Sequence, residues 1–110
     1  MREVDIGFAG RFPESDPIHE SLSSLSPGDA LSVRKSKYHW ELIDRGGNTV
    51  GKLAKAFELP KGLACLSAKV RAIIVVRREA GDPKYLPLYP SPRWEAIIPE
   101  LLFAPTPSNT

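Results

Sequence analysis

The sequence predicts a mainly β fold: a small, strongly curved, partly open barrel of five to six strands with one or two short helical turns. Three observations support this class. Short segments alternate apolar and polar residues with a period of two, which is typical of strands with one buried face. Turn-forming residues separate these segments at short intervals. Finally, the chain lacks the long amphipathic segments that would serve as helical crossovers in a parallel sheet.

Size and composition indicate one domain. The chain has 110 residues, of which 42% are hydrophobic and 25% are charged. We expect a single domain over residues 1–104 and a disordered tail over 105–110. The single cysteine, Cys65, cannot form an internal disulfide and is expected to pack as a small hydrophobic residue. We see neither a membrane-spanning run nor a leader-like start, so we expect a cytoplasmic protein.

The first part of the chain contains one predicted strand and one segment with two readings. Apolar residues alternate with polar or small ones over 4–8, which predicts a strand. In residues 18–29, apolar residues at helical spacing indicate a short helical turn, whereas the serines favour a loop. The Ser-Pro-Gly-Asp sequence at 26–29 is typical of a turn with proline preset at its second position.

Three segments in the centre of the chain predict successive strands, at 30–34, 38–44 and the start of 49–57. The adjacent glycines at 46–47 supply the positive φ that a tight hairpin needs. The segment that starts at residue 49 is expected to end as one helical turn. Tyr38, Trp40 and Leu42 share one face of their strand, and we expect Trp40 to pack into the core.

The last part of the chain predicts two long strands. Residues 64–79 are rich in β-branched side chains, and the alternation places Val70, Ala72, Ile74 and Val76 on one face. Residues 80–92 hold four prolines and predict a loop. The strand pattern returns over 93–103, with Trp94, Ala96 and Ile98 on one face.

The charge distribution is segregated. Residues 32–78 carry eleven Lys or Arg against three acids, a net of +8, while the remainder carries four bases against ten acids, a net of −6. A basic segment of this kind is typical of nucleic-acid-binding proteins. The alternative is that the cations merely solvate the outer faces of strands.

No catalytic constellation is evident. His19 and His39 lie in unrelated contexts, and one cysteine with two histidines lacks zinc-site spacing. The glycines and lysine of "DRGGNTVGK" lack the Ser or Thr that follows the lysine of a phosphate-binding loop, and they lie in a predicted hairpin. We therefore expect a protein that is not an enzyme, with no metal, no cofactor and no small-molecule substrate.

Basic and aromatic residues are interleaved at 34–40. Single-stranded nucleic acid is bound by this mixture, because cations contact phosphates while rings stack on bases. For Tyr38 and Tyr85, packing against the body of the domain is the alternative. The candidate nucleic-acid-binding residues are Arg34, Lys35, Lys37, Tyr38, Lys52, Lys55, Arg77 and Tyr85.

The order of motifs resembles that of the HIRAN domain, an OB-like small barrel attached to DNA helicases and translocases. The motifs are "DIGFAG", then "GD-x-L-x-V-R", "D-x-x-G-x-x-V-G-x-L" and "A-x-V-x-A-I". The part from "WELIDRGG" to "RWEAIIPELLF" also resembles the terminal segment of large bacterial RecQ-type ATP-dependent DNA helicases. One departure is that "RKSKYHWEL" replaces the usual "N-x-x-D-x-x-A" stretch of HIRAN domains.

This resemblance implies a function. HIRAN domains bind single-stranded DNA, in particular a free 3′ end, with basic and aromatic residues on the barrel face. The resemblance therefore implies a non-enzymatic, nucleoid-associated DNA-repair module, with single-stranded or frayed DNA and other domains of the same helicase chain as partners. Of the candidate residues it covers only Arg34. The rival hypothesis is a protein-interaction or structural β domain that docks another domain or subunit through the proline-rich loop or an exposed sheet edge.

Overall fold

The fold is mainly β, as predicted. The computed structural model describes residues 4–37, 39–54, 57–58, 61–80 and 89–105. These residues form a five-stranded antiparallel sheet in the order β3-β2-β1-β4-β5, with β3 and β5 at its edges. The strands are β1 (Ala30–Lys35), β2 (Trp40–Ile43), β3 (Thr49–Lys52), β4 (Leu63–Arg77) and β5 (Arg93–Pro105). One α-helix, α1 (Pro17–Ser23), and two 3-10 helices, η1 (Ala9–Arg11) and η2 (Arg78–Ala80), complete the described elements.

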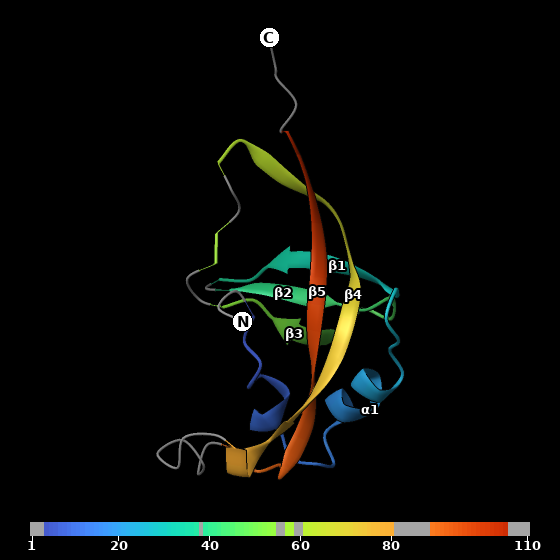
Figure 1. Cartoon of the computed structure of the whole chain (residues 1–110), viewed down its shortest axis with the longest axis vertical. Helices are drawn as coiled ribbons and strands as arrows, with labels where there is room; N and C mark the ends of the chain where they lie inside the picture. The colour runs from blue at the N-terminus through green and yellow to red at the C-terminus, as the bar shows by residue number, and fades with distance from the viewer. Residues whose placement is uncertain (1–3, 38, 55–56, 59–60, 81–88, 106–110) are drawn as a thin grey trace.

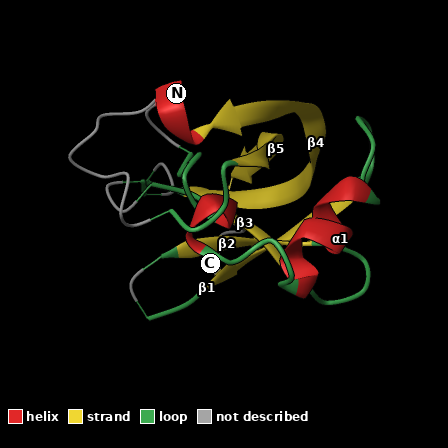
Figure 2. Ribbon diagram, turned by 90° about the horizontal axis from the view of Figure 1, so that it is seen from below, coloured by secondary structure: helices red, strands yellow, loops and turns green. Residues whose placement is uncertain are grey.

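The sheet is strongly curved and does not close. In Figure 1 the β4–β5 ribbon follows the long axis of the molecule while β1, β2 and β3 cross it. β1 joins β4 through only two residue pairs, Ala30 with Lys69 and Leu31 with Ala68, so the two parts of the sheet are free to diverge. Seen from below, β4 curls over the layer formed by β1, β2 and β3, with α1 beside it (Figure 2). The predicted curvature and open edge are therefore confirmed.

The predicted strand at 4–8 is wrong. Val4 forms a single bridge with Leu53. The chain then turns, because the carboxylate of Asp5 accepts a hydrogen bond from the backbone N–H of Gly7 (3.2 Å). This local bond competes with a strand ladder and directs the chain into η1.

The segment with two readings contains a helix. Pro17 lies in the first turn of α1, where its missing N–H removes no helical hydrogen bond. Asp16 caps the helix by accepting a hydrogen bond from the backbone N–H of Ile18 (2.9 Å). Ile18 and Leu22, spaced by four residues, are both buried, and this spacing places them on the same helical face.

The turn at 26–29 is confirmed. Gly28 has a φ of +95°, and the N–H of Asp29 donates to the carbonyl of Ser26 (3.1 Å). Gly28 also donates its N–H to the carbonyl of Val70 (2.6 Å), while Val70 donates to the carbonyl of Asp29 (2.9 Å). These bonds join the turn to β4 and direct the backbone polar groups of Val70 towards β1.

The orientation of Val70 explains how β5 tolerates two prolines. In an antiparallel pair of strands, residues directly opposite each other either both direct their backbone N–H and C=O towards the other strand or both direct them away from it. Val70 pairs with Pro99, so the nitrogen of Pro99 faces the free edge of β5 and costs no ladder bond. Pro105 lies an even number of residues further along β5 and faces the same edge. It extends β5 one residue into the predicted tail; 106–110 lie outside the described residues.

A β-bulge in β3 brings into the core two residues that a regular strand would place on opposite faces. Leu42 pairs with Gly51, and the next pair skips Val50, so both Val50 and Gly51 lie opposite Leu42. As a result Val50 and Leu53, three residues apart, are each only 1% exposed.

A second bulge corrects the predicted faces of β4. Arg71 is the extra residue between the pairs formed by Val70 and Ala72. The alternation shifts there, so Ile73 packs against the core while Ile74 is 36% exposed. Further along β4, Val76 packs against the core, as its predicted face requires, and Val75 is 60% exposed. In β5, which has no extra residue, Trp94, Ala96 and Ile98 are buried as predicted. Ile97, on the opposite face, is buried too, so this part of β5 is covered on both faces.

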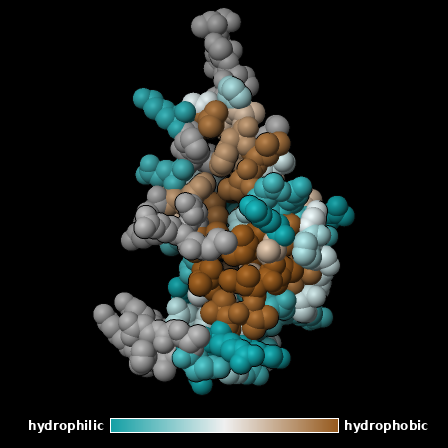
Figure 3. Space-filling view, in the orientation of Figure 1, coloured by the Kyte–Doolittle hydropathy of each residue, from teal (hydrophilic) through white to brown (hydrophobic). Residues whose placement is uncertain are grey.

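The core is formed where the β4–β5 ribbon, α1 and β1–β3 meet. Trp94 anchors one side: its indole N–H donates to the carbonyl of Ile6 (2.7 Å), and its ring stacks on Tyr89 with centroids 5.0 Å apart. Figure 3 shows apolar side chains gathered over the middle of this face and continuing upward along the ribbon. The buried cluster comprises Phe8, Ala9, Ile18, Leu22, Leu31, Leu42, Val50, Leu53, Ala68, Val70, Trp94 and Ile97.

Candidate nucleic-acid interface

Four of the predicted cations lie at one end of the β1–β2–β3 sheet. Arg34 pairs with Glu41, and Glu41 pairs with Lys52, so these three residues form a row across the strands. Because adjacent strands lie about 4.8 Å apart, the backbones of Arg34 and Lys52 are separated by about 10 Å. Lys35 pairs with Trp40 one step along the strands. We call this region the basic end of the sheet; it comprises Arg34, Lys35, Lys37, Lys52, Trp40 and Glu41.

The turn between β1 and β2 holds this end together. The backbone N–H of Ser36 and its Oγ both donate to the carbonyl of His39, at 2.7 and 3.0 Å. These two hydrogen bonds to one carbonyl close the turn. The turn carries Lys37, which is exposed. Two predicted contact residues, Tyr38 and Lys55, lie outside the described residues.

The basic end carries one carboxylate against four cations, a formal net of +3. Nη2 of Arg34 lies 3.3 Å from Oε1 of Glu41, and the side chain of Arg34 is 61% exposed. Because a guanidinium has five N–H donors, this single contact leaves most of them directed to solvent. The pair therefore orients Arg34 and only partly balances its charge.

A neighbouring carboxylate is occupied by another cation. The backbone N–H of Asp5 donates to the carbonyl of Lys52 (2.9 Å), which places Asp5 beside the basic end. Its carboxylate accepts two hydrogen bonds from Arg11, at 2.6 and 3.1 Å. Hydrogen bonding to Asp5 raises the pKa of the Arg11 guanidinium further above its ordinary value.

Two lysines of the basic end contact aromatic rings. Nζ of Lys35 lies 5.7 Å from the ring centroid of Trp40, and Nζ of Lys52 lies 5.4 Å from that of Phe8. Phe8 is buried, but Trp40 is only half-buried. Trp40 packs against the core as expected, but it stays partly exposed, and Lys35 also contacts its ring.

The structure separates Arg77 from the basic end. β1 runs antiparallel to β4, so it leads away from the end of β4 that carries Arg77. Arg77 lies eight residues beyond Lys69, which is about 26 Å of strand. It pairs with Arg93, another cation that the charge count did not single out. Tyr85, proposed with Arg77 as part of the same groove, lies outside the described residues.

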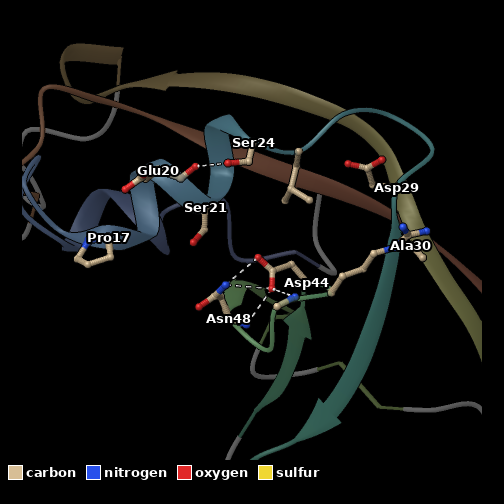
Figure 4. Close-up of a pocket in the computed structure, with 11 residues that line it drawn as sticks. Pro17, Glu20, Ser21, Ser24, Asp29, Ala30, Asp44 and Asn48 are labelled. Carbon is tan, nitrogen blue, oxygen red and sulfur yellow. Dashed lines mark hydrogen bonds between the residues drawn. The ribbon is translucent and has the colours of Figure 1, made fainter.

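A cleft of about 440 Å³ lies between α1 and the β2–β3 turn, at the other end of the sheet (Figure 4). Several of its polar groups are already bonded within the fold. The carboxylate of Asp44 accepts from the backbone of Gly46 and Asn48, each at 2.9 Å, and from the Asn48 side chain. Ser24 Oγ donates to the carbonyl of Glu20 (2.8 Å). The glycine-rich sequence here forms a hairpin turn organised by Asp44, so it does not form a phosphate-binding loop.

Sequence reasoning missed a contact between His19 and Ser91, which are 72 residues apart. Nε2 of His19 lies 3.2 Å from the carbonyl oxygen of Phe12 and 3.4 Å from Oγ of Ser91, which itself donates to that carbonyl (2.8 Å). Ser91 is completely buried. Its hydroxyl is inaccessible to a substrate, so this network has the geometry of a structural contact between α1 and the segment before β5.

Other classes of site find no support in the part of the chain that the structure describes. There, no group of three or more His, Cys, Asp or Glu side chains is placed to hold a metal ion. None of the described helices has the length and apolar character needed to cross a membrane.

Comparisons of the chain with protein-family models, curated proteins and solved structures found no match. The resemblance to HIRAN domains therefore stays a prediction.

Proposed function

We propose that this chain is a non-enzymatic module that binds single-stranded nucleic acid at the basic end of the sheet. The observation that supports this function most is the strand register. It gathers Arg34, Lys35 and Lys52 within about 10 Å of one another, although they span nineteen residues of sequence. Phosphates would contact these cations and Lys37 at the edge where the strands end. Side chains alternate along each strand, so Lys35 and the partly exposed ring of Trp40 share one face of the sheet, and Arg34 and Lys52 share the other. The HIRAN-like motif order adds the proposal that a helicase-type protein carries this module in DNA repair.

The chemistry of the basic end suits a flexible phosphate backbone. Arg34 presents a planar fork of donors that matches phosphate oxygens, whereas the lysines act as mobile point charges. Lys52 and Lys35 rest on rings through contacts that are weak at exposed sites, about 0.5–1 kcal/mol, so either ammonium can turn towards a phosphate. The one carboxylate, Glu41, is only 16% exposed and sits behind Arg34.

Salt dependence tests the proposal. We expect a labelled twelve-nucleotide deoxythymidine strand to bind with a micromolar or lower dissociation constant at low salt, measured by fluorescence anisotropy. With four phosphate contacts, the logarithm of the association constant should fall with the logarithm of salt concentration with a slope of about −3. Absence of binding at low salt would refute the proposal.

Matched variants locate the interface. Arg34→Gln, Lys35→Gln and Lys52→Gln should each weaken binding and reduce the salt slope by about 0.7. The control is Lys69→Gln, because Lys69 lies in β4 and forms an ion pair with Glu100 (3.2 Å). If Lys69→Gln weakened binding as much as Lys52→Gln, the interface would lie elsewhere.

A second candidate function, docking of another domain or subunit, is favoured by the free end of the β4–β5 ribbon. Residues 63–67 and 101–105 extend beyond the pairs with β1, carry no charged side chain, and expose 56% of Leu102. Exposed apolar patches of this kind are typical of protein contacts. This function predicts concentration-dependent self-association in sedimentation velocity that Leu102→Lys abolishes, with no response to the oligonucleotide. A monomer at all concentrations, unchanged by Leu102→Lys, would count against self-association.

A further inference from the structure

We infer that Trp40 is a base-stacking subsite, which Lys35 covers in the free protein and vacates when a nucleobase binds. The inference rests on the proposed nucleic-acid function and adds to it the residue that receives an unstacked base. The ligand is the flat face of a purine or pyrimidine in a single strand, together with the phosphate attached to it.

The backbone of Trp40 is fixed on both sides. Trp40 begins β2, where it pairs with Lys35 of β1. On the other side its carbonyl accepts a hydrogen bond from the backbone N–H of Leu53 (2.9 Å), a residue that is 1% exposed. The closed turn between Ser36 and His39 holds the two strands together directly beside it. Trp40 can therefore present its ring without having to be ordered by the ligand, which lowers the entropic cost of binding.

The ring is partly accessible, and the group that lies over it is mobile. Trp40 is half-buried and packs against the core, while the ammonium of Lys35 lies 5.7 Å from the ring centroid. Lys35 itself is exposed. An exposed and flexible side chain is therefore the group that covers the ring, so a planar base that displaces it encounters no rigid obstacle.

Four other described aromatic rings are buried or packed against another ring. Phe8 and Trp94 are 7% and 5% exposed. Tyr89 stacks on Trp94, and Phe12 makes an edge contact with Phe8 at 5.3 Å between centroids. Trp40 differs from these four rings because the group over it is the exposed side chain of Lys35, a cation of the basic end on the same face of the sheet.

Magnitudes favour exchange of Lys35 for a base. A cation over an exposed ring contributes about a 2- to 5-fold factor in an equilibrium. A base stacked on an aromatic side chain contributes about a 5- to 150-fold factor in affinity. The base is therefore expected to displace the ammonium from the ring. The displaced ammonium remains within reach of the phosphate of the same nucleotide. Because every base has a π face, this subsite is expected to tolerate any sequence.

An abasic strand isolates the stacking contribution. Wild-type protein should bind a strand of abasic sites, with the same number of phosphates, about 5- to 150-fold more weakly than the normal strand. Trp40→Leu should lose a similar factor for the normal strand and little for the abasic strand. The control is Phe57→Leu, an aromatic residue near the end of β3 that is partly buried against the core. Equal losses of Trp40→Leu on both strands, or no loss on either, would overturn the inference.

Intrinsic fluorescence gives a second readout that does not depend on a folded Trp40→Leu variant. The chain has two tryptophans, and Trp94 is buried. We expect the normal strand to quench the wild-type signal, and Trp40→Phe to remove that quenching while Trp94→Phe retains it. In the free protein, Lys35→Ala should make Trp40 more accessible to acrylamide.

The two proposals fail in different ways. If the labelled strand binds at the basic end without quenching Trp40 and with equal affinity for abasic DNA, the stacking subsite is refuted and the phosphate contacts stand. If no strand binds at low salt, both proposals fall.

Discussion

Gly10 lies against Trp94 so closely that a Cβ atom on Gly10 would stand 2.5 Å from the indole ring. Trp94 is held in place by its bond to Ile6 and by its stack on Tyr89, so it cannot move aside. The 3-10 helix η1 is thus packed backbone-to-ring on β5, and this contact connects the N-terminal segment to the β4–β5 ribbon.

Gly10→Ala is expected to destabilise the fold by about 1–3 kcal/mol, because the added methyl overpacks a rigid aromatic contact. Urea unfolding followed by far-UV circular dichroism measures the change. The matched control is Gly46→Ala, where the nearest atom to the new methyl is the amide nitrogen of Asn48 (3.0 Å), at the end of a side chain in an exposed turn and not in a buried ring. Equal stability of Gly10→Ala and wild type would contradict the packing described.

Pro99→Thr is expected to expose a free N–H at the edge of β5 and to increase aggregation, because edge strands with open donors pair with other chains. Light scattering during storage at high concentration measures this effect. Hydrogen exchange adds a sharper readout: the amide introduced at position 99 should exchange rapidly because it faces solvent. A strongly protected amide there would show that position 99 faces β4 instead.

Cys65 is expected to react slowly with thiol reagents at neutral pH. Burial raises the pKa of the Cys65 thiol, although a weak hydrogen bond to the carbonyl of Ser67 (3.5 Å) opposes this. The unfolded thiol then ionises at lower pH than the folded one. This group's contribution to stability is therefore fully present below the unfolded pKa and is lost as pH rises through the folded pKa. The pH midpoint of alkylation should be higher in native than in denatured protein; equal midpoints would exclude the effect.

The ion pairs Arg11–Asp5 and Lys69–Glu100 differ in geometry and should therefore contribute differently to the free energy of unfolding. Arg11→Gln removes a two-bond contact to Asp5 and a guanidinium 6.0 Å from the Tyr89 ring, so we expect a loss of about 1 kcal/mol in the free energy of unfolding. Lys69→Gln removes a single exposed contact to Glu100 and should cost less than about 0.5 kcal/mol. Denaturant titrations of both variants make the comparison. A larger loss for Lys69→Gln would show that contact geometry does not decide the order.

Local pattern was a good guide to the strands that were long or bounded by turns. The strands predicted at 64–79 and 93–103 agree with β4 and β5 to within two residues at each end, because β-branched alternation and flanking prolines are strong local signals. At 4–8 the same alternation was misleading, since one hydrogen bond from Gly7 to Asp5 sufficed to bend the chain.

Local sequence patterns could not predict which residues change face at the β-bulges in β3 and β4, and they could not predict the geometry of the candidate site. The extra residues Val50 and Arg71 leave no mark in the alternation, yet each shifts it by one step. The contact between His19 and Ser91 joins segments that have no local relation. The alternation correctly placed Trp40 against the core, but it could not show that its position at the start of β2 leaves the ring partly exposed beside Lys35.

The sequence by itself determined the mainly β class, the positions of the longer strands, the turn at 26–29 and the basic character of the central segment. These properties depend on side-chain type and spacing within a few residues, which the chain carries wherever it folds. Only the tertiary structure decided which cations are neighbours. It placed Arg34 and Lys52 in one row and sent Arg77 to the far end of β4, because register and strand direction are set by hydrogen bonds between distant residues.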